Sequence, residues 1–191
     1  DDAFCDLVVG AYAPLVSNGD DGAVFIYSGK AGTDLTMGGV EDSPALAYRR
    51  VTFQTKSQVG RSIAVANFNG DDFDDILFGE PYYNGAFDNV GAAYVILGDL
   101  DLSTVATSWS AVEELLPHHT GDSKNDSEGW MVSTTHHDND GITDIVLTSL
   151  ADEAINSPNN TGTMRIYLGV QGSLPSQSIA LELTGTHTGD R

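Results

Sequence analysis

Oxygen-bearing side chains recur at alternate positions between residues 67 and 75. They occupy the first, third, fifth and ninth positions of this stretch: Asn67, Asn69, Asp71 and Asp75. Alternation points every second residue of an extended loop to the same side, and calcium takes roughly six to eight oxygen ligands from carboxylates, amides and main-chain carbonyls. A solvated turn without metal is the alternative, because Asn, Asp and Gly also favour turns. The odd-position spacing favours a calcium-binding loop.

The second half of this loop recurs twice in the chain. The stretch 138–144 repeats it downstream, and the stretch 2–6 repeats it at the N-terminus. Asp75 lies 69 residues after Asp6, and Asp144 lies 69 residues after Asp75. A period of this length predicts a repeat architecture rather than a single closed domain.

Apolar runs bounded by glycines separate the loops. In the first period they are rich in β-branched and aromatic residues, as strands are, and they cover 7–9, 22–29, 46–55 and 60–66. Later periods repeat them at 75–78, 91–98, 129–133, 144–147, 162–169 and 179–183. The segment 100–116 has the weakest strand signals; residues 111–116 are also compatible with a helical turn, but their place in the period favours a strand. The sequence therefore predicts an all-β fold of three repeats, 1–66, 67–135 and 136–191, with a four-stranded sheet per repeat.

These residues resemble the FG-GAP repeat of integrin α-subunits and of many bacterial secreted and surface proteins. The family signature is Phe-Gly before the first strand, then a calcium loop and an apolar strand that ends in Gly-Ala-Pro. Here the Phe-Gly position holds Val59-Gly60 and Glu128-Gly129, and the Gly-Ala-Pro position holds Gly10-Ala11, Gly79-Glu80-Pro81 and Thr148-Ser149-Leu150. The resemblance covers nearly the whole chain. It implies about three blades of four antiparallel strands, within a larger β-propeller that commonly has about seven blades.

The resemblance also implies a calcium site in each loop. In the middle loop the ligands are the side chains of Asn67, Asn69, Asp71 and Asp75 and the main-chain carbonyl of Phe73. In the third loop they are His136, Asp138, Asp140, Asp144 and the carbonyl of Ile142, and in the N-terminal loop they are Asp2, Asp6 and the carbonyl of Phe4. A hard cation disfavours nitrogen, so we expect His136 to turn away and water to replace it. We expect the incomplete N-terminal set to hold metal poorly.

The balance of charge is strongly acidic. The chain has 28 Asp plus Glu against 8 Lys plus Arg, which gives a formal net charge of −20. Such a field repels nucleic acid and anionic lipid and attracts cations, so we expect no nucleic-acid partner. Calcium bound in the loops would offset the repulsion between carboxylates. We therefore expect folding to be coupled to calcium.

Several features favour an extracellular or cell-surface location. The chain has one cysteine, Cys5, and therefore cannot form an internal disulfide. A bound metal is the remaining kind of cross-link that could stabilise the fold. Millimolar calcium outside cells suits loops of modest affinity, and Asn125 and Asn159 begin glycosylation sequons. No apolar run approaches a membrane span and no signal peptide opens the chain. Because the chain begins inside a cation loop and ends just before the next expected strand, we expect an excerpt truncated at both ends.

Other kinds of chemistry find little support in the residues. The adjacent pairs His118-His119 and His136-His137 would point to opposite faces of a strand, so we expect surface histidines rather than a transition-metal site. A further set would form a glycan platform or pack between blades: Trp109, Trp130, Tyr82, Tyr83 and Tyr94. No nucleophile elbow or phosphate-binding loop occurs, so we expect no catalysis.

The sequence and the resemblance thus predict a calcium-binding extracellular propeller module that acts in cell adhesion, by binding a protein or a glycan, or as a scaffold. An enzymatic alternative stays open, because similar propellers occur in secreted polysaccharide lyases and beside phospholipases. A structural alternative is self-association through the open edges of unfinished blades. Such edges recruit further strands and would build a ring, a fibre or a surface layer.

Overall fold

The computed structural model describes residues 6–12, 22–27, 46–49, 57–98, 118–150 and 161–186, and these residues form an all-β fold, as predicted. The strands are β1 (Leu7–Ala11), β2 (Ala23–Tyr27), β3 (Leu46–Arg49), β4 (Ile63–Ala66), β5 (Asp75–Glu80), β6 (Ala92–Ile96), β7 (His118–Thr120), β8 (Met131–Thr135), β9 (Asp144–Ser149), β10 (Thr163–Tyr167) and β11 (Ile179–Thr184). Within these ranges there is no helix that is long and apolar enough to cross a membrane. The strand predicted at 111–116 lies outside the described residues.

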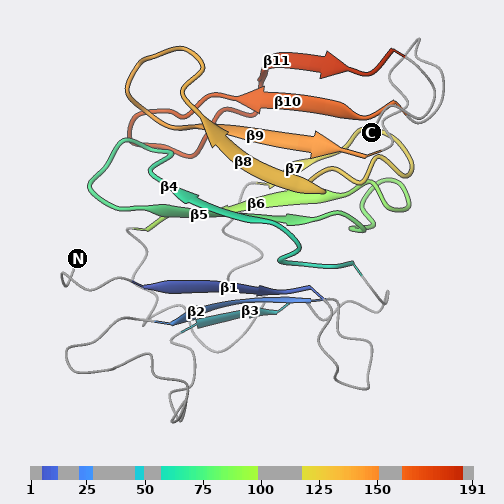
Figure 1. The fold of residues 1–191 in the computed structure, drawn as a ribbon, viewed down its shortest axis with the longest axis horizontal. Coiled ribbons are helices and arrows are strands. Elements are labelled where there is room, and N and C mark those ends of the chain that lie inside the picture. The colour runs from blue at the N-terminus through green and yellow to red at the C-terminus, as the bar shows by residue number, and fades with distance from the viewer. Residues whose placement is uncertain are drawn as a thin grey trace.

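Three antiparallel sheets stack face to face (Figure 1). The described strands of the first sheet follow the order β1, β2, β3, and those of the second follow the order β4, β5, β6, β7. The third sheet has the order β11, β10, β9, β8. Four-stranded antiparallel sheets that pack through their faces are the blades of a β-propeller.

The second and third sheets each begin one strand before the sequence period that predicted them. The strand at 63–66 falls in the predicted repeat 1–66, but it pairs with β5, from Ile63↔Phe78 to Ala66↔Asp75. In the same way β8 pairs with β9 of the following period. Each complete candidate calcium loop is therefore the connection of a β-hairpin within one sheet, and not the boundary between two sheets.

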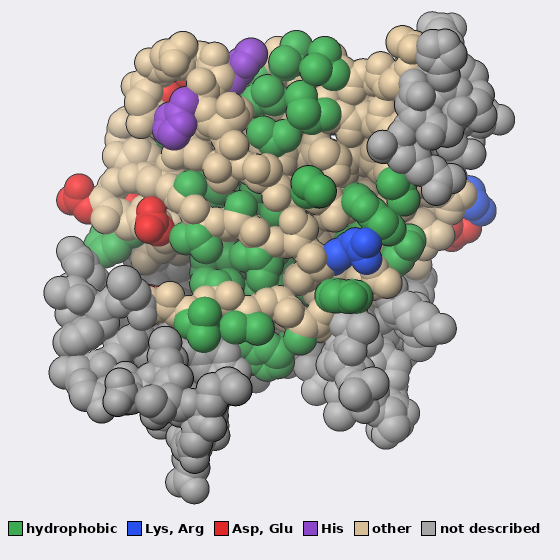
Figure 2. Space-filling view, viewed as in Figure 1, with side chains coloured by type: hydrophobic (Ala, Val, Ile, Leu, Met, Phe, Trp, Pro, Cys, Tyr) green, Lys and Arg blue, Asp and Glu red, His purple; other side chains and the backbone are tan. Residues whose placement is uncertain are grey.

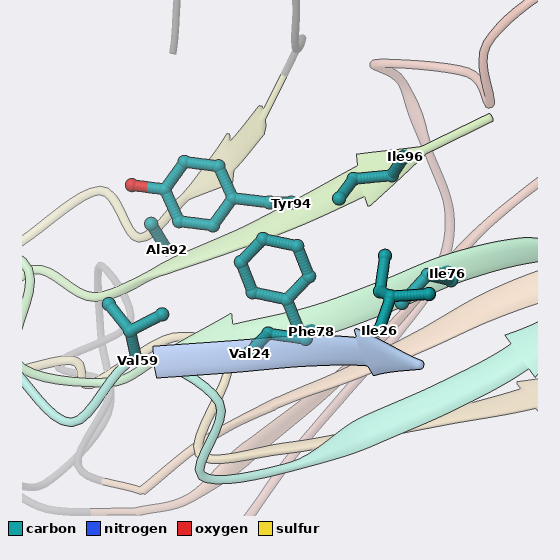
Figure 3. Close-up of a cluster of buried hydrophobic side chains, with 8 residues drawn as sticks. All are labelled: Val24, Ile26, Val59, Ile76, Phe78, Ala92, Tyr94 and Ile96. Carbon is teal, nitrogen blue, oxygen red and sulfur yellow. The ribbon is translucent and has the colours of Figure 1, made fainter. Parts of the chain in front are cut away.

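The middle sheet is buried on both of its faces. Successive side chains of a strand point to opposite sides, and every position of β5 and β6 is buried. One face packs on the first sheet, where Phe78 and Tyr94 stack with ring centroids 5.3 Å apart and contact Val24 and Ile26 of β2 (Figure 3). Burying each such apolar side chain contributes about 1.5–3 kcal/mol. This cluster therefore fixes the first two sheets together.

The other face of the middle sheet packs on the third sheet. The buried cluster there contains Phe68, Leu77, Ala93, Val95, Val132, Ile145, Leu147 and Tyr167. His119 of β7 also contacts this cluster, because its ring centroid lies 4.0 Å from that of Tyr167 and its side chain is only 6 % exposed. The prediction of surface histidines at 118–119 is therefore wrong for His119, whose ring packs against an aromatic residue of the neighbouring sheet.

The outer faces of the stack carry exposed apolar side chains. Leu7 and Val9 of β1 are 43 % and 38 % exposed, and Met131 and Leu183 of the third sheet are 57 % and 55 % exposed. Figure 2 shows hydrophobic side chains gathered over β11 at the top of the view. Groups of exposed apolar residues mark contact surfaces more often than isolated ones do.

Candidate metal centre

The two complete candidate loops lie at the same end of the stack of sheets (Figure 1). The first loop, 67–75, connects β4 to β5, and the second, 136–144, connects β8 to β9. The strand after each loop begins at the ninth-position aspartate, Asp75 or Asp144, as the sequence predicts.

Side-chain oxygens fold the loop between β4 and β5 into consecutive tight turns. Asn67 Oδ1 accepts a hydrogen bond from the Gly70 amide at 2.7 Å, and Asn69 Oδ1 accepts one from the Asp71 amide at 3.0 Å. Asp71 Oδ1 accepts one from the Phe73 amide at 2.7 Å. The side-chain amides of Asn67 and Asn69 both donate to Asp71, to its main-chain oxygen and to its Oδ2. Positions one, three and five are therefore in mutual contact, in turns that Asn and Asp favour.

The loop between β8 and β9 repeats part of this pattern. Asp138 Oδ1 accepts a hydrogen bond from the Asp140 amide at 3.2 Å, and Asp140 Oδ1 accepts one from the Ile142 amide at 2.8 Å. The same pairs of positions are joined in the first loop. The fourth position is left-handed in both loops, at Gly70 with φ 71° and at Asn139 with φ 61°. Glycine and asparagine tolerate this conformation at little cost.

The ninth-position aspartate of the first loop joins separate parts of its sheet. Asp75 is fully buried, and its Oδ2 accepts a hydrogen bond of 2.7 Å from the Phe68 amide at the second loop position. Its Oδ1 accepts one of 2.9 Å from the Gly98 amide, just after β6. A buried amide that loses its acceptor costs about 1–3 kcal/mol. Asp75 is therefore a structural residue, whatever the loop binds.

Asp144 has the same place in the third sheet. It is fully buried and accepts main-chain hydrogen bonds from His137 and, at 2.9 Å, from Gly169. An ionised carboxylate has about four lone-pair sites, so two main-chain bonds leave capacity for a cation. Sequence reasoning gave these aspartates to calcium alone and missed the structural role. The available signal was the glycine that ends the next apolar run in both repeats, Gly98 and Gly169.

The donor chemistry of the first loop fits calcium, because every assigned ligand is an oxygen. In the second loop His136 offers nitrogen, which fits less well, and its Nε2 lies 3.5 Å from the Thr143 hydroxyl. Across the described ranges no three His, Cys, Asp or Glu side chains gather as a metal-binding group. In the first loop only Asp71 and Asp75 of the assigned ligands are carboxylates, so its set depends on amide and main-chain oxygens as well.

The N-terminal set is only partly described. Asp6 is exposed and precedes β1, whereas Asp2 and Phe4 lie outside the described residues. Of these three candidates, the structure therefore places only Asp6.

The third repeat covers the first loop, whereas the described residues place no such cover over the second. Main-chain oxygens of the first loop accept hydrogen bonds from amides of the third repeat: Asn67 from Thr143 at 3.2 Å, Phe68 from Val170 at 3.2 Å and Asn69 from Gly172 at 2.6 Å. The Gln171 side chain donates to the main-chain oxygen at the fourth loop position at 2.9 Å. As a result Asn69 is only 4 % exposed, whereas its equivalent Asp138 is exposed. The first loop is therefore part of the contact between two sheets.

A buried ion pair in the third sheet also escaped sequence reasoning. Arg165 Nη1 lies 2.8 Å from Glu128 Oε2, and both side chains are buried. Arg165 Nε also lies 2.8 Å from Glu182 Oε2, across the β10–β11 pair. In the middle sheet the residue that corresponds to Arg165 is the uncharged Tyr94, whose hydroxyl donates to Glu80 at 2.7 Å. The third sheet thus carries more buried charge than its neighbour.

Two of the predicted platform aromatics meet at the other end of the sheets. The guanidinium carbon of Arg61 lies 3.8 Å from the centre of the Trp130 ring and 5.7 Å from that of Tyr12. Tyr82 meets Trp130 edge to face, with centroids 6.1 Å apart. Cation–π contacts of this kind are worth about 0.5–1 kcal/mol when exposed. The other candidates differ in position: Tyr94 is in the core, Tyr83 packs against the core, and Trp109 lies outside the described residues.

Comparison with known protein families matches residues 59–96 to the FG-GAP repeat. The chain contains an FG-GAP repeat. The match begins at the turn before β4 and ends at the end of β6, so this FG-GAP repeat includes the whole loop 67–75. FG-GAP repeats form blades of β-propellers, which agrees with the face-to-face sheets described above. No curated protein sequence matches the chain.

Proposed function

We propose that the chain is a calcium-binding, non-catalytic FG-GAP module of an extracellular or cell-surface protein. The observation that carries this proposal is the loop 67–75, where the oxygen-bearing side chains of positions one, three and five contact one another beside a buried aspartate. Oxygen donors at this spacing match the requirements of a hard cation. In this proposal Asn67, Asn69, Asp71 and Asp75 and the carbonyl of Phe73 hold the ion.

The proposed role of calcium is to stabilise the contact between the second and third sheets. The loop 67–75 accepts main-chain hydrogen bonds from the third repeat, so a cation that rigidifies the loop also fixes those acceptors. It further offsets repulsion in a chain with a formal net charge of −20. The second loop, 136–144, binds more weakly in this proposal, because His136 stands at its first position and the side chains of its first five positions are exposed.

FG-GAP repeats are typical of extracellular and surface proteins and are generally non-catalytic, which supports a role in adhesion, in binding a protein or glycan, or as a scaffold. A second candidate is self-association. The exposed apolar residues Leu7, Val9, Met131 and Leu183 on the two outer faces favour it, because stacked sheets bury such faces against one another. Multi-angle light scattering over a range of protein concentrations in calcium separates the two: a constant monomer mass would contradict self-association.

Thermal unfolding with and without calcium tests the proposal. At calcium about one hundredfold above the dissociation constant, binding to the folded state alone adds about 2.7 kcal/mol, or roughly 5–10 °C in Tm for a chain of this size. We expect that rise in millimolar calcium relative to excess chelator, and little change with magnesium, which demands stricter geometry. Asp71→Ala, which removes a proposed ligand and leaves Asp75 in place, should abolish the rise. Equal Tm values in calcium and chelator would contradict the proposal.

A further inference from the structure

Two turns of the type Xaa-Gly dock on a neighbouring sheet in the same way. The first, Val59-Gly60, precedes β4 and forms a parallel bridge to Gly22 at the start of β2. A Cβ added at Gly22 would collide with Val59, and one added at Gly10 in β1 would collide with the main-chain oxygen of Gly60. Gly10 and Gly22 thus leave room for the main chain of the Val59-Gly60 turn to lie directly against the first sheet. We call this contact site, formed by the two glycines, a socket.

The second turn, Glu128-Gly129, repeats this docking 69 residues later. Glu128 forms a parallel bridge to Gly91 at the start of β6. A Cβ added at Gly79 in β5 would collide with the main-chain oxygen of Gly129, and one added at Gly129 would collide with that of Ala92. The first and second sheets therefore each hold one Xaa-Gly turn in an equivalent socket.

The third sheet has a cavity of about 460 Å³ at the equivalent place. Its lining includes Gly162, which corresponds to Gly22 and Gly91, and Thr148, which corresponds to Gly10 and Gly79. The rest of the wall is largely apolar and includes Trp130, Met131, Met164 and Leu183. The cavity is thus a third copy of the socket, which the described residues do not fill.

The two occupied sockets also show which residue follows the glycine. Arg61 follows Gly60, Trp130 follows Gly129, and the Arg61 guanidinium stacks on the Trp130 ring at 3.8 Å. Trp130 also lines the third socket. The residue after the glycine of a third turn would therefore lie near this indole, and a cation there gains from cation–π attraction. A cationic segment is further favoured by the formal net charge of −20.

We propose that the third socket binds, in trans, a polypeptide turn of the sequence type Xaa-Gly-Arg. The main chain of the Xaa-Gly pair would lie against Gly162, and the arginine would lie beside Trp130. A second copy of this chain does not supply this turn from its described residues, because Val59-Gly60 and Glu128-Gly129 fill their own sockets. The proposed partner is accordingly a polypeptide that carries an Xaa-Gly-Arg turn not already docked in a socket of its own.

Thr148 sets how closely such a turn approaches. Both occupied sockets have glycine at this position, where any Cβ would meet a main-chain oxygen of the docked turn. The Thr148 hydroxyl is held by the main chain of Met131, with contacts of 3.1 and 3.3 Å, so its side chain has little freedom to move aside. We therefore expect Thr148 to hold a docked turn farther from the third sheet than Gly10 and Gly79 hold the turns on the first and second sheets.

Peptide binding to the 191-residue chain in millimolar calcium tests this proposal. The probe is a synthetic peptide of residues 57–66, which carries Val59-Gly60-Arg61, and the readout is the NMR signals of ¹³C-methyl methionine. We expect saturable shifts of the Met131 and Met164 methyl groups, assigned with Met131→Leu and Met164→Leu. Peptides with Gly60→Ala or Arg61→Ala should bind less tightly, the first because Gly60 is left-handed with φ 75°.

Thr148→Gly and Thr148→Ala form a matched pair, because both lose the hydroxyl and only the first loses the Cβ. We expect Thr148→Gly to bind the peptide about fivefold more tightly than Thr148→Ala, the gain of roughly one additional main-chain contact. If Thr148→Gly does not fold, the wild-type titration with the three peptides still decides the question. Methyl signals that stay unchanged with every peptide, or equal binding of the Gly60→Ala peptide, would overturn the proposal. Neither result depends on whether the loop 67–75 binds calcium.

Discussion

The loops 67–75 and 136–144 have the same main-chain frame but different surroundings. In both, a buried aspartate at the ninth position accepts two main-chain hydrogen bonds, and the side chains at positions three and five cap tight turns. The first loop lies under the third repeat, whereas the second is exposed. The ninth position therefore holds the sheet together in both loops, and in the proposed calcium site the earlier positions supply the remaining oxygen donors.

The two contacts between sheets differ in a related way. The first contains the apolar cluster of Phe78 and Tyr94 beside the hydrogen bond from Tyr94 to Glu80, whereas the second lies beside the buried pair of Arg165 and Glu128. Buried ion pairs add little net stability but are costly to break, because the remaining charge loses its partner. We therefore expect the free energy of unfolding to depend more strongly on the choice of substituted residue in the third sheet than in the middle sheet.

Asp75→Ala should cause a larger loss of stability than replacement of the polar side chains at the earlier odd positions of its loop, Asn67, Asn69 and Asp71. It leaves the buried amide of Phe68 and the part-buried amide of Gly98 without their acceptor, and we expect a loss of about 3–5 kcal/mol in the free energy of unfolding. Asn67→Ala should cost about 1 kcal/mol or less, because that side chain is partly exposed and water replaces its oxygen. Urea unfolding in the presence of chelator measures both effects without the contribution of calcium.

Asp144→Ala is the matched control, since Asp144 accepts the equivalent amides in the third sheet. It should lose about as much as Asp75→Ala when calcium is absent. A loss in chelator for Asn67→Ala as large as that for Asp75→Ala would show that the ninth position has no special structural role.

Arg165→Met should rank next, with a loss of about 3 kcal/mol. The substitution keeps much of the side-chain volume but removes the cation that lies 2.8 Å from the buried Glu128 carboxylate. Tyr94→Phe, its counterpart in the middle sheet, removes one hydrogen bond to Glu80 and should cost about 1 kcal/mol. Chemical denaturation at neutral pH compares the two. If Arg165→Met proved no more harmful than Tyr94→Phe, the buried ion pair would not distinguish the sheets.

The third sheet should also limit stability at alkaline pH. Burial raises the pKa of Tyr167 well above its usual range, and the nearby Glu128 carboxylate adds to the rise. The unfolded chain ionises this tyrosine near pH 10, but the folded chain does not, so stability falls as the pH rises above about 10, by up to about 1.4 kcal/mol per pH unit. Between pH 9 and 11 the free energy of unfolding should therefore fall less steeply with pH for Tyr167→Phe than for the wild type. Parallel curves would rule out this contribution.

His136→Asp should produce the smallest effect and would make the two loops more alike. An oxygen donor at the first position of loop 136–144 suits calcium better than nitrogen does, so we expect calcium affinity at this loop to rise by about tenfold, or roughly 1.4 kcal/mol. Isothermal titration calorimetry in the background of Asp71→Ala isolates this loop from the other. His136→Gln is the control for loss of the imidazole. An unchanged affinity would mean that the exposed surroundings, and not the donor, limit binding.

Local sequence patterns predicted the features that depend on neighbouring residues. The all-β class, the recurrence of the loop and the strands that begin at Asp75 and Asp144 follow from alternation and spacing over a few residues. The pairing of Glu128 with Arg165 joins residues 37 apart, and the burial of His119 depends on Tyr167 in another sheet. No short-range pattern contains such contacts. The sequence period also did not show to which sheet Ile63–Ala66 belongs. A repeat length gives the spacing of the strands but not whether this strand pairs with the strand before it or with β5 after it.

The central claim is that calcium binds in the loop 67–75, and residue-resolved NMR tests it most directly. In a calcium titration of the ¹⁵N-labelled chain, we expect saturable shifts of the loop amides from Phe68 to Asp75, together with that of Gly98, which donates to Asp75. Asp71→Ala should remove these shifts and leave the rest of the spectrum folded. Loop amides that do not move at millimolar calcium, or shifts confined to other parts of the chain, would contradict the account.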